Sequence, residues 1–145
     1  MGNDVLVVAE HLRGALNDIT FEMIGQGKAL ARELGGACLV AVVGGSDAIV
    51  AQLAAADGVV RVDGPGLESF NPETHSAALR AVVAAKAPRV VLVGYTSMGM
   101  DLASTLAIAT DMPLAASCLR VTGGERITAV SQLYGGKMNV TASAA

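Results

Sequence analysis

VVLVGYTSMGMD, at residues 90–101, holds the clearest strand–loop–helix pattern in this sequence of 145 residues. The apolar run predicts a buried strand, and the small and polar residues after it predict a tight loop. The segment from Ser97 predicts a helix that this serine caps. In an open α/β sheet ligands most often bind at such a junction, because free N–H groups of the helix N-terminus point outward. The candidate cofactor-binding residues are therefore Gly94, Thr96, Ser97 and Gly99.

Upstream of this junction, short apolar runs alternate with helical patterns. The runs that predict strands are Val5–Ala9, Ala37–Val43, Val59–Val62 and Arg89–Val93. The predicted helices begin at Asn17 or Asp18, at Ser46, at Asn71-Pro72 and at Ser97. Strands and helices in alternation predict a mainly parallel sheet with helices on both faces. The fold class is α/β, a Rossmann-like three-layer sandwich with strand order of about 3-2-1-4-5.

The last thirty residues follow a different pattern. Three apolar runs, at Ala115–Val121, Ile127–Leu133 and Lys137–Ala142, are separated by Gly123-Gly124 and Gly135-Gly136, as in hairpins. We expect these strands to extend or cap the edge of the parallel sheet. The chain is predicted to be one domain over residues 1–145. Its end, directly after an apolar strand, suggests a domain of a longer chain.

Composition excludes several classes of function. The net charge is −3 and no basic cluster occurs, so no nucleic acid is expected as a partner. No apolar run approaches the ~18 residues that a membrane span needs, and no signal peptide is evident. The cysteines, Cys38 and Cys118, both lie in predicted strands, which favours buried, reduced thiols and a cytoplasmic location.

Signature motifs of nucleotide enzymes are missing. The chain has no G-x-G-x-x-G after its first strand and no P-loop. Residues 44–47, GGSD, resemble the SGGxDS loop of ATP pyrophosphatases, but a plain turn with a helix cap at Ser46 is the better interpretation. Glu10 and His11 could act as an acid–base pair, but no nucleophile lies at a suitable spacing, and chance polar residues of a loop are the better interpretation. His75 is expected on the surface, and no spacing fits a metal site, so no catalytic or metal-binding residue is assigned.

Two interpretations of residues 94–99 stay open at this point. Backbone amides and the hydroxyls of Thr96 and Ser97 can hold a phosphate or a polar loop of a partner. The other interpretation is a capped turn between strand and helix, of the kind that every α/β protein has.

Several short motifs, in order along the chain, carry a family resemblance. They are VLVVAEH at 5–11, GALN at 14–17, DGV at 57–59, GMDL at 99–102 and YGG at 134–136. In this order they resemble the N-terminal part of electron-transfer flavoprotein alpha subunits. That family usually continues with Pro-Arg-Val-Ala-Ala after its Asp-Leu. Residues 103–107 read ASTLA instead, so a contact made by that arginine is in doubt.

The resemblance implies an adenine-nucleotide-alpha-hydrolase-like domain that scaffolds and docks but performs no chemistry. In the family FAD is bound mainly by a C-terminal domain, which this chain lacks, and AMP by the beta subunit. The implied partners are a beta subunit and, through the complex, flavin dehydrogenases whose electrons pass through the FAD. The resemblance thus implies an electron-carrier component, not an enzyme. The alternative is a stand-alone adenine-nucleotide-binding protein, like universal stress proteins, with the nucleotide between residues 10–16 and 94–101.

Overall fold

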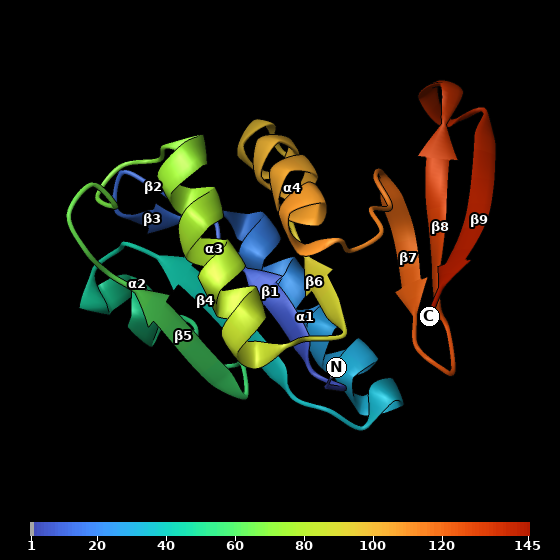
Figure 1. Cartoon of the computed structure of the whole chain (residues 1–145), viewed down its shortest axis with the longest axis horizontal. Coiled ribbons are helices and arrows are strands. Elements are labelled where there is room, and N and C mark those ends of the chain that lie inside the picture. The colour runs from blue at the N-terminus through green and yellow to red at the C-terminus, as the bar shows by residue number, and fades with distance from the viewer. Residues whose placement is uncertain (1) are drawn as a thin grey trace.

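The described part of the chain forms two larger sheets that stand side by side and a small two-stranded hairpin. The structure is a computed structural model and describes residues 2–145. A four-stranded parallel sheet lies between helices, and a three-stranded antiparallel sheet stands at the C-terminal side of this body (Figure 1). Among the described residues no helix is both long and apolar enough to cross a membrane.

The parallel sheet confirms the α/β class. Its strands are β1 (Val5–Val8), β4 (Cys38–Val43), β5 (Gly58–Val62) and β6 (Val90–Leu92). They pair in the order β5-β4-β1-β6, all parallel, with Val7 between Val40 and Leu92. Counted along the chain, this is the predicted order 3-2-1-4.

Four helices cover the two faces of the parallel sheet. They are α1 (Asp18–Leu34), α2 (Asp47–Ala51), α3 (Pro72–Lys86) and α4 (Ser97–Thr110). The α3 helix begins where the sequence predicts. The Asn71 side chain caps it by accepting hydrogen bonds from the N–H groups of Glu73 and Thr74. The α2 helix also begins as predicted, after Ser46, but ends at Ala51 instead of near Ala56.

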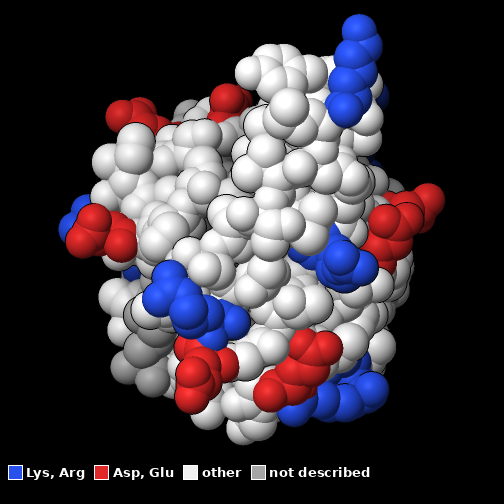
Figure 2. Space-filling model, turned by 90° about the vertical axis from the view of Figure 1, so that its right-hand side faces the viewer, with Lys and Arg blue, Asp and Glu red and all other residues white. Residues whose placement is uncertain are grey.

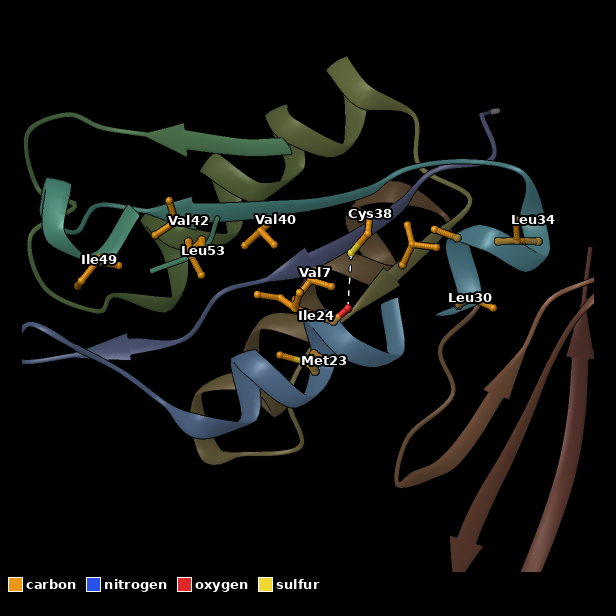
Figure 3. Close-up of a cluster of buried hydrophobic side chains, with 12 residues drawn as sticks. Val7, Met23, Ile24, Leu30, Leu34, Cys38, Val40, Val42, Ile49 and Leu53 are labelled. Carbon is orange, nitrogen blue, oxygen red and sulfur yellow. Dashed lines mark hydrogen bonds between the residues drawn. The ribbon is translucent and has the colours of Figure 1, made fainter. Parts of the chain in front are cut away.

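Alternate strand residues enter two separate cores. Val5, Val7, Val40 and Val42 pack with α1 and α2, whereas Leu6, Val8, Ala41 and Val43 pack with α3 and α4. Figure 3 shows the first of these clusters around Cys38 and Met23. Helices cover both faces of β1, and this strand is accordingly apolar at every position. The burial of each such side chain contributes about 1.5–3 kcal/mol to the stability of the fold.

Two glycines interrupt α1, and they serve different purposes. A Cβ atom at Gly27 would lie 2.9 Å from Cys38 Sγ and from Val7 Cγ2, so only glycine lets this helix approach the sheet so closely. Gly25 is exposed and a Cβ atom there would meet nothing within 4 Å. Close packing of α1 on the sheet therefore depends on Gly27 and not on Gly25.

The C-terminal strands form a sheet of their own. They are β7 (Cys118–Thr122), β8 (Ile127–Leu133) and β9 (Met138–Ala144), paired antiparallel in that order, with a short 3-10 turn at Tyr134–Gly136. The hairpins are as predicted. The prediction of a fifth strand at the edge of the parallel sheet is wrong: β7 bonds to β8 alone, because a short hairpin satisfies its ladder locally.

One end of the antiparallel sheet is tied to the body. The N–H of Gly123 donates to Glu33 Oε2 at 2.7 Å, and Arg89 Nη2 donates to the carbonyl oxygen of Glu125 at 2.6 Å. Val121 and Ile127 pack against the core beneath α1. Away from these contacts the strands extend past the body, as Figure 1 shows.

Candidate functional site

The loop that follows β6 meets the segment that follows β1 at the carboxyl edge of the parallel sheet. Thr96 Oγ1 donates to Glu10 Oε2 at 2.7 Å, across 86 positions of sequence. Asn17 Nδ2 donates to the other carboxylate oxygen, Oε1, at 3.0 Å. The short β2–β3 hairpin (His11–Leu12 and Ala15–Leu16) lies between Glu10 and Asn17, where the sequence predicted only a loop. Both oxygens of Glu10 are thereby occupied by partners within the chain.

Thr96, not Ser97, caps α4. The N–H of Gly99 donates to Thr96 Oγ1 at 3.0 Å, while Ser97 is the first residue of the helix and is exposed. The predicted cap at Ser97 is therefore wrong by one residue. Thr96 is the cap because its hydroxyl can accept a hydrogen bond from a helix N–H and donate one to Glu10 at the same time. These two bonds use the donor of the hydroxyl and one of its two acceptor lone pairs.

The two glycines of the loop allow close packing. A Cβ atom at Gly99 would overlap the carbonyl oxygen of Gly94, and one at Gly94 would lie 3.3 Å from Glu10 Oε2 and from Ile19. Thus three of the four candidate residues, Gly94, Thr96 and Gly99, shape the junction itself. Only Ser97 presents a side chain to solvent, and the cofactor-binding role of the four residues stays a prediction.

His11 and His75 lie beside this junction with separate partners. His11 Nε2 donates to the carbonyl oxygen of Val43 at 2.8 Å. His75 is only 8% exposed and its ring meets Phe70 edge-on, with 5.1 Å between centroids. The prediction of a surface position for His75 is wrong, because Phe70 covers this turn of α3. Burial, and then electrostatic repulsion from the neighbouring His11, lowers the pKa of His75 below its ordinary value.

The space enclosed between these residues is small. A cavity of about 20 Å³ is lined by Glu10, His11, His75, Gly94 and Met98, among others. This volume suits about one water molecule. The carboxylate of Glu10 also places a negative charge beside the N-terminus of α4, where a phosphate would sit. The Glu10 carboxylate thus opposes the binding of a phosphate at this helix N-terminus.

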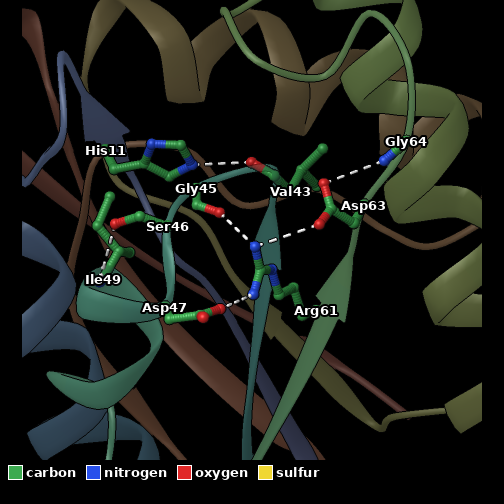
Figure 4. A network of polar contacts seen from close by, with 9 residues as sticks. All are labelled: His11, Val43, Gly45, Ser46, Asp47, Ile49, Arg61, Asp63 and Gly64. Atoms are coloured by element: carbon green, nitrogen blue, oxygen red, sulfur yellow. Dashed lines mark hydrogen bonds and ion pairs between the residues drawn. The ribbon is translucent and has the colours of Figure 1, made fainter.

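The neighbouring GGSD turn is held by an exposed arginine (Figure 4). Arg61 of β5 forms ion pairs with Asp47 and Asp63 and donates to the carbonyl oxygen of Gly45. The N–H of Ile49 donates to Ser46 Oγ at 3.4 Å, which confirms Ser46 as the cap of α2. This turn joins β4 to α2, as a plain turn with a helix cap does, and Arg61 ties it to the neighbouring strand β5.

The two cysteines differ in exposure. Cys38 is completely buried, and its burial, and then the charge of Asp57, raises the pKa of this thiol. Cys118 is exposed, so its predicted burial is wrong: its strand lies in the sheet that the helices do not cover. Both thiols are free, and within residues 2–145 no group of three or more His, Cys, Asp or Glu residues is placed to hold a metal.

Comparison with known proteins finds similar sequences along nearly the whole chain. The sequence pattern of the family described as "Electron transfer flavoprotein domain" matches residues 5–145. The electron transfer flavoprotein subunit alpha of Bacillus subtilis is 30% identical over 142 residues, covering 94% of this chain and 43% of that protein. The subunit of the same name from Methylophilus methylotrophus is 33% identical over 140 residues, covering 94% and 43%.

A relative with a different name shares the same region. The acryloyl-CoA reductase electron transfer subunit beta of Anaerotignum propionicum is 31% identical over 118 residues, covering 79% of this chain and 32% of that protein. The chain thus spans less than half the length of these three relatives.

Proposed function

The chain belongs to the electron transfer flavoprotein family, and from this premise we propose that it is a docking domain of an alpha-type subunit. Its role is to bind a beta-type subunit and to support the part of the complex that holds the FAD. The electrons of flavin dehydrogenases pass through that FAD. The domain contributes shape and contacts to electron transfer and takes no part in the chemistry.

One observation carries this proposal: the polar groups at the carboxyl edge of the sheet bind each other. Glu10 accepts from Asn17 and Thr96, and Thr96 caps α4, so the residues that a ligand would use already have partners. The space left is about 20 Å³. A site arranged in this way is a rigid junction rather than a cradle for a cofactor, which supports FAD and AMP being held elsewhere in the complex.

The names of the relatives support a second, different subunit as the partner of this chain. A subunit named alpha implies a second, different subunit, and the family match covers nearly the whole of this chain. We therefore propose a one-to-one complex with a beta-type subunit that carries AMP. In such a complex the FAD lies on residues that this chain of 145 positions does not contain.

Mixing this chain with the beta-type subunit of the same organism tests the proposal. We expect a one-to-one complex in sedimentation, and no stoichiometric FAD in the purified chain alone, as judged by its visible absorbance. A yellow chain with one FAD per molecule would overturn the docking role. So would failure to form any complex with the beta-type subunit.

The stand-alone nucleotide-binding protein is the alternative function, and calorimetry separates it from docking. Titration of this chain with AMP and with ATP should give no saturable heat if the Glu10–Thr96 contact keeps the junction closed. Saturable binding of AMP at one site per chain, lost in a Ser97→Asp variant, would favour the alternative. The side chain of Ser97 is exposed, so this change leaves the fold intact while it adds charge to the loop.

A further inference from the structure

His75 is set apart from most ionisable side chains of this protein by its burial. On the side of the molecule that carries the antiparallel sheet, the Lys, Arg, Asp and Glu side chains stand out into solvent (Figure 2). His75 is 8% exposed, although Glu73 and Thr74, which precede it in the first turn of α3, are exposed. The hydrogen bonds of its ring show what this side chain does there.

The ring of His75 holds the start of its own helix. Its Nδ1 accepts a long hydrogen bond, 3.4 Å, from the N–H of Asn71, the residue that caps α3. Because Nδ1 accepts, the single proton of the neutral ring lies on Nε2. The arrangement is related to a capping box, in which a side chain of the first turn reaches back to the N–H of the cap. The ring also meets Phe70 edge-on. His75 therefore contacts both residues through which the preceding loop enters α3.

The loop before α3 has few other attachments. We call residues 64–70, GPGLESF, the strap. Among the described residues, the hydrogen bonds of the strap run within it or to the adjacent Asp63. Leu67 and Phe70 pack against the core that α3 and α4 cover, and a Cβ atom at Gly44 would overlap the carbonyl oxygen of Leu67. Two apolar side chains thus hold the strap over the end of β4, and the His75 ring holds its last residue.

Proton uptake by His75 removes the hydrogen bond to Asn71. A neutral imidazole takes up its second proton at the nitrogen that carries none, and in His75 that nitrogen is the acceptor Nδ1. The protonated Nδ1 is a donor and would face the N–H of Asn71 with another N–H. His11 is different, because its Nε2 donates to the carbonyl oxygen of Val43 (Figure 4). A proton enters His11 at Nδ1, so its bond to Val43 is kept.

The surroundings of His75 do not favour its charged form. In the cavity beside it, the other ionisable groups are the imidazole of His11 and the carboxylate of Glu10, whose two oxygens already accept hydrogen bonds within the chain. The strand β4 and the helix α4 contribute only uncharged residues to this lining, namely Val43, Met98, Gly99 and Leu102. The carboxylates on the strap, before it and in the first turn of α3 are exposed, namely Glu68, Asp63 and Glu73.

We propose that the His75 side chain is a pH-sensitive latch, which holds the strap closed over the carboxyl edge of the parallel sheet when it is neutral and releases the strap when it is protonated. The opening is local: Leu67, Phe70 and the cavity beside Glu10 become accessible, while the sheet and the rest of α3 stay folded. This device adds a response to pH at the edge of the sheet and goes beyond the proposed docking function.

Acid favours the open form of the strap. Burial, and then repulsion from His11, lowers the pKa of His75 in the closed form, and the pKa returns toward 6.5 when the ring meets water. The open form therefore binds more protons. Between about pH 7.5 and about pH 5.5 the protonated fraction of an exposed histidine rises from about a tenth to about nine tenths. The equilibrium constant for opening consequently rises by up to about tenfold over this range.

Amide hydrogen exchange of the whole chain, followed by NMR and corrected for the intrinsic rate at each pH, tests the latch. We expect the protection of the Asn71 amide to fall about three- to tenfold from about pH 7.5 to about pH 5.5, because closing requires the neutral ring. The amides of residues 79–83, further along α3, should keep their protection. The ring signals of His75 and the amide of Asn71 should titrate with one midpoint.

Two isosteric variants separate the latch from a merely structural role. His75→Asn keeps an acceptor near the position of Nδ1 but cannot take up a proton, so the protection of the Asn71 amide should become independent of pH. His11→Gln keeps a donor for the carbonyl oxygen of Val43 and removes the repulsion. This variant should keep the pH dependence, with a midpoint shifted to higher pH.

Proteolysis checks that the strap itself opens. A protease that cleaves before large apolar residues can cut at Leu67 and Phe70, and comparison of the wild type with His75→Asn at one pH cancels the pH dependence of the protease. The wild type should be cut in the strap about threefold or more faster than the variant at about pH 6, and at the same rate at about pH 7.5.

Three results would overturn the latch. One is a protection of the Asn71 amide that does not change with pH in the wild type, and another is an equal change in His75→Asn. The third is a loss of protection in residues 79–83 that parallels the loss at Asn71, since acid would then unfold the helix rather than open the strap. All of these measurements use the chain without a beta-type subunit, so they leave the test of the proposed function separate.

Discussion

The parallel sheet and the antiparallel sheet of this chain differ in how far their strands are buried. Every residue of β1 lies inside the body, between α1 on one face and α3 and α4 on the other. Of the seven residues of β9, six are exposed. The strands differ both in sequence and in what covers them: β1 reads VLVV, whereas β9 reads MNVTASA and carries Asn, Thr and Ser among its apolar residues.

This difference indicates where each sheet obtains its stability. The body gains from burial on both faces of its sheet, which is the dominant favourable contribution to folding. The antiparallel sheet relies on its own ladders and on a few ties near Gly123 and Glu125. A surface so little used within the chain is available to a partner.

The largest expected effect is a difference in thiol reactivity, since each sheet carries one cysteine. Cys38 in β4 is fully buried and burial raises the pKa of its thiol, whereas Cys118 in β7 is exposed. Cys118 should react with a thiol reagent on the order of 10³-fold faster than Cys38, which must wait for unfolding. Mass spectrometry of peptides after timed labelling measures both rates, and equal rates would contradict the burial of β4.

The next effect compares one leucine from each region. Leu79→Ala removes a fully buried side chain from between α3 and the sheet and should lower the free energy of unfolding by about 2–5 kcal/mol. Leu133→Ala is the matched change on the antiparallel sheet, at a side chain that is 42% exposed, and should cost under about 1 kcal/mol. Urea denaturation measures both. Equal losses would mean that the two sheets are buried alike in solution.

The junction at the carboxyl edge gives a smaller effect. Thr96→Ala removes the cap of α4 and the bond to Glu10, which should cost about 1–2 kcal/mol. Ser97→Ala, one position later, removes an exposed hydroxyl and should change the free energy of unfolding by less than about 0.5 kcal/mol. The same urea experiment distinguishes them. A larger loss of unfolding free energy in the Ser97→Ala variant would mean that Ser97, the cap predicted from the sequence, caps α4.

The smallest effect is a pH dependence that comes from His75. Because the pKa of this group is lowered in the folded state, the unfolded chain binds more protons just below the ordinary value of 6.5. The free energy of unfolding should therefore fall as the pH drops from above 6.5 toward the lowered pKa. A His75→Asn variant should lose this part of the slope in urea midpoints taken across that range. An unchanged slope would show that other groups cause it.

The sequence anticipated much of the candidate site and missed the contact that defines it. Strands that end at one edge of a parallel sheet bring their loops together, and the loop after β1 does meet the loop after β6. The bond from Thr96 to Glu10 was not anticipated, because nothing in a sequence links two polar residues 86 positions apart. The burial of His75 was missed for a similar reason, since its cover depends on how the ring of Phe70 lies.

By itself, the sequence determined the features that rest on local chemistry. Continuous apolar runs predict the covered strands, and Asn71-Pro72 predicts the start of α3. The Gly135-Gly136 pair between two apolar runs predicts the hairpin of β8 and β9. These follow from the period of a strand or helix and from the hydrogen bonds of a cap, which neighbouring residues decide. The tertiary structure decided which of two adjacent hydroxyls caps α4. It also decided that β7 leaves the parallel sheet. Long-range packing governs both of these choices, and with them which apolar face stays open to solvent.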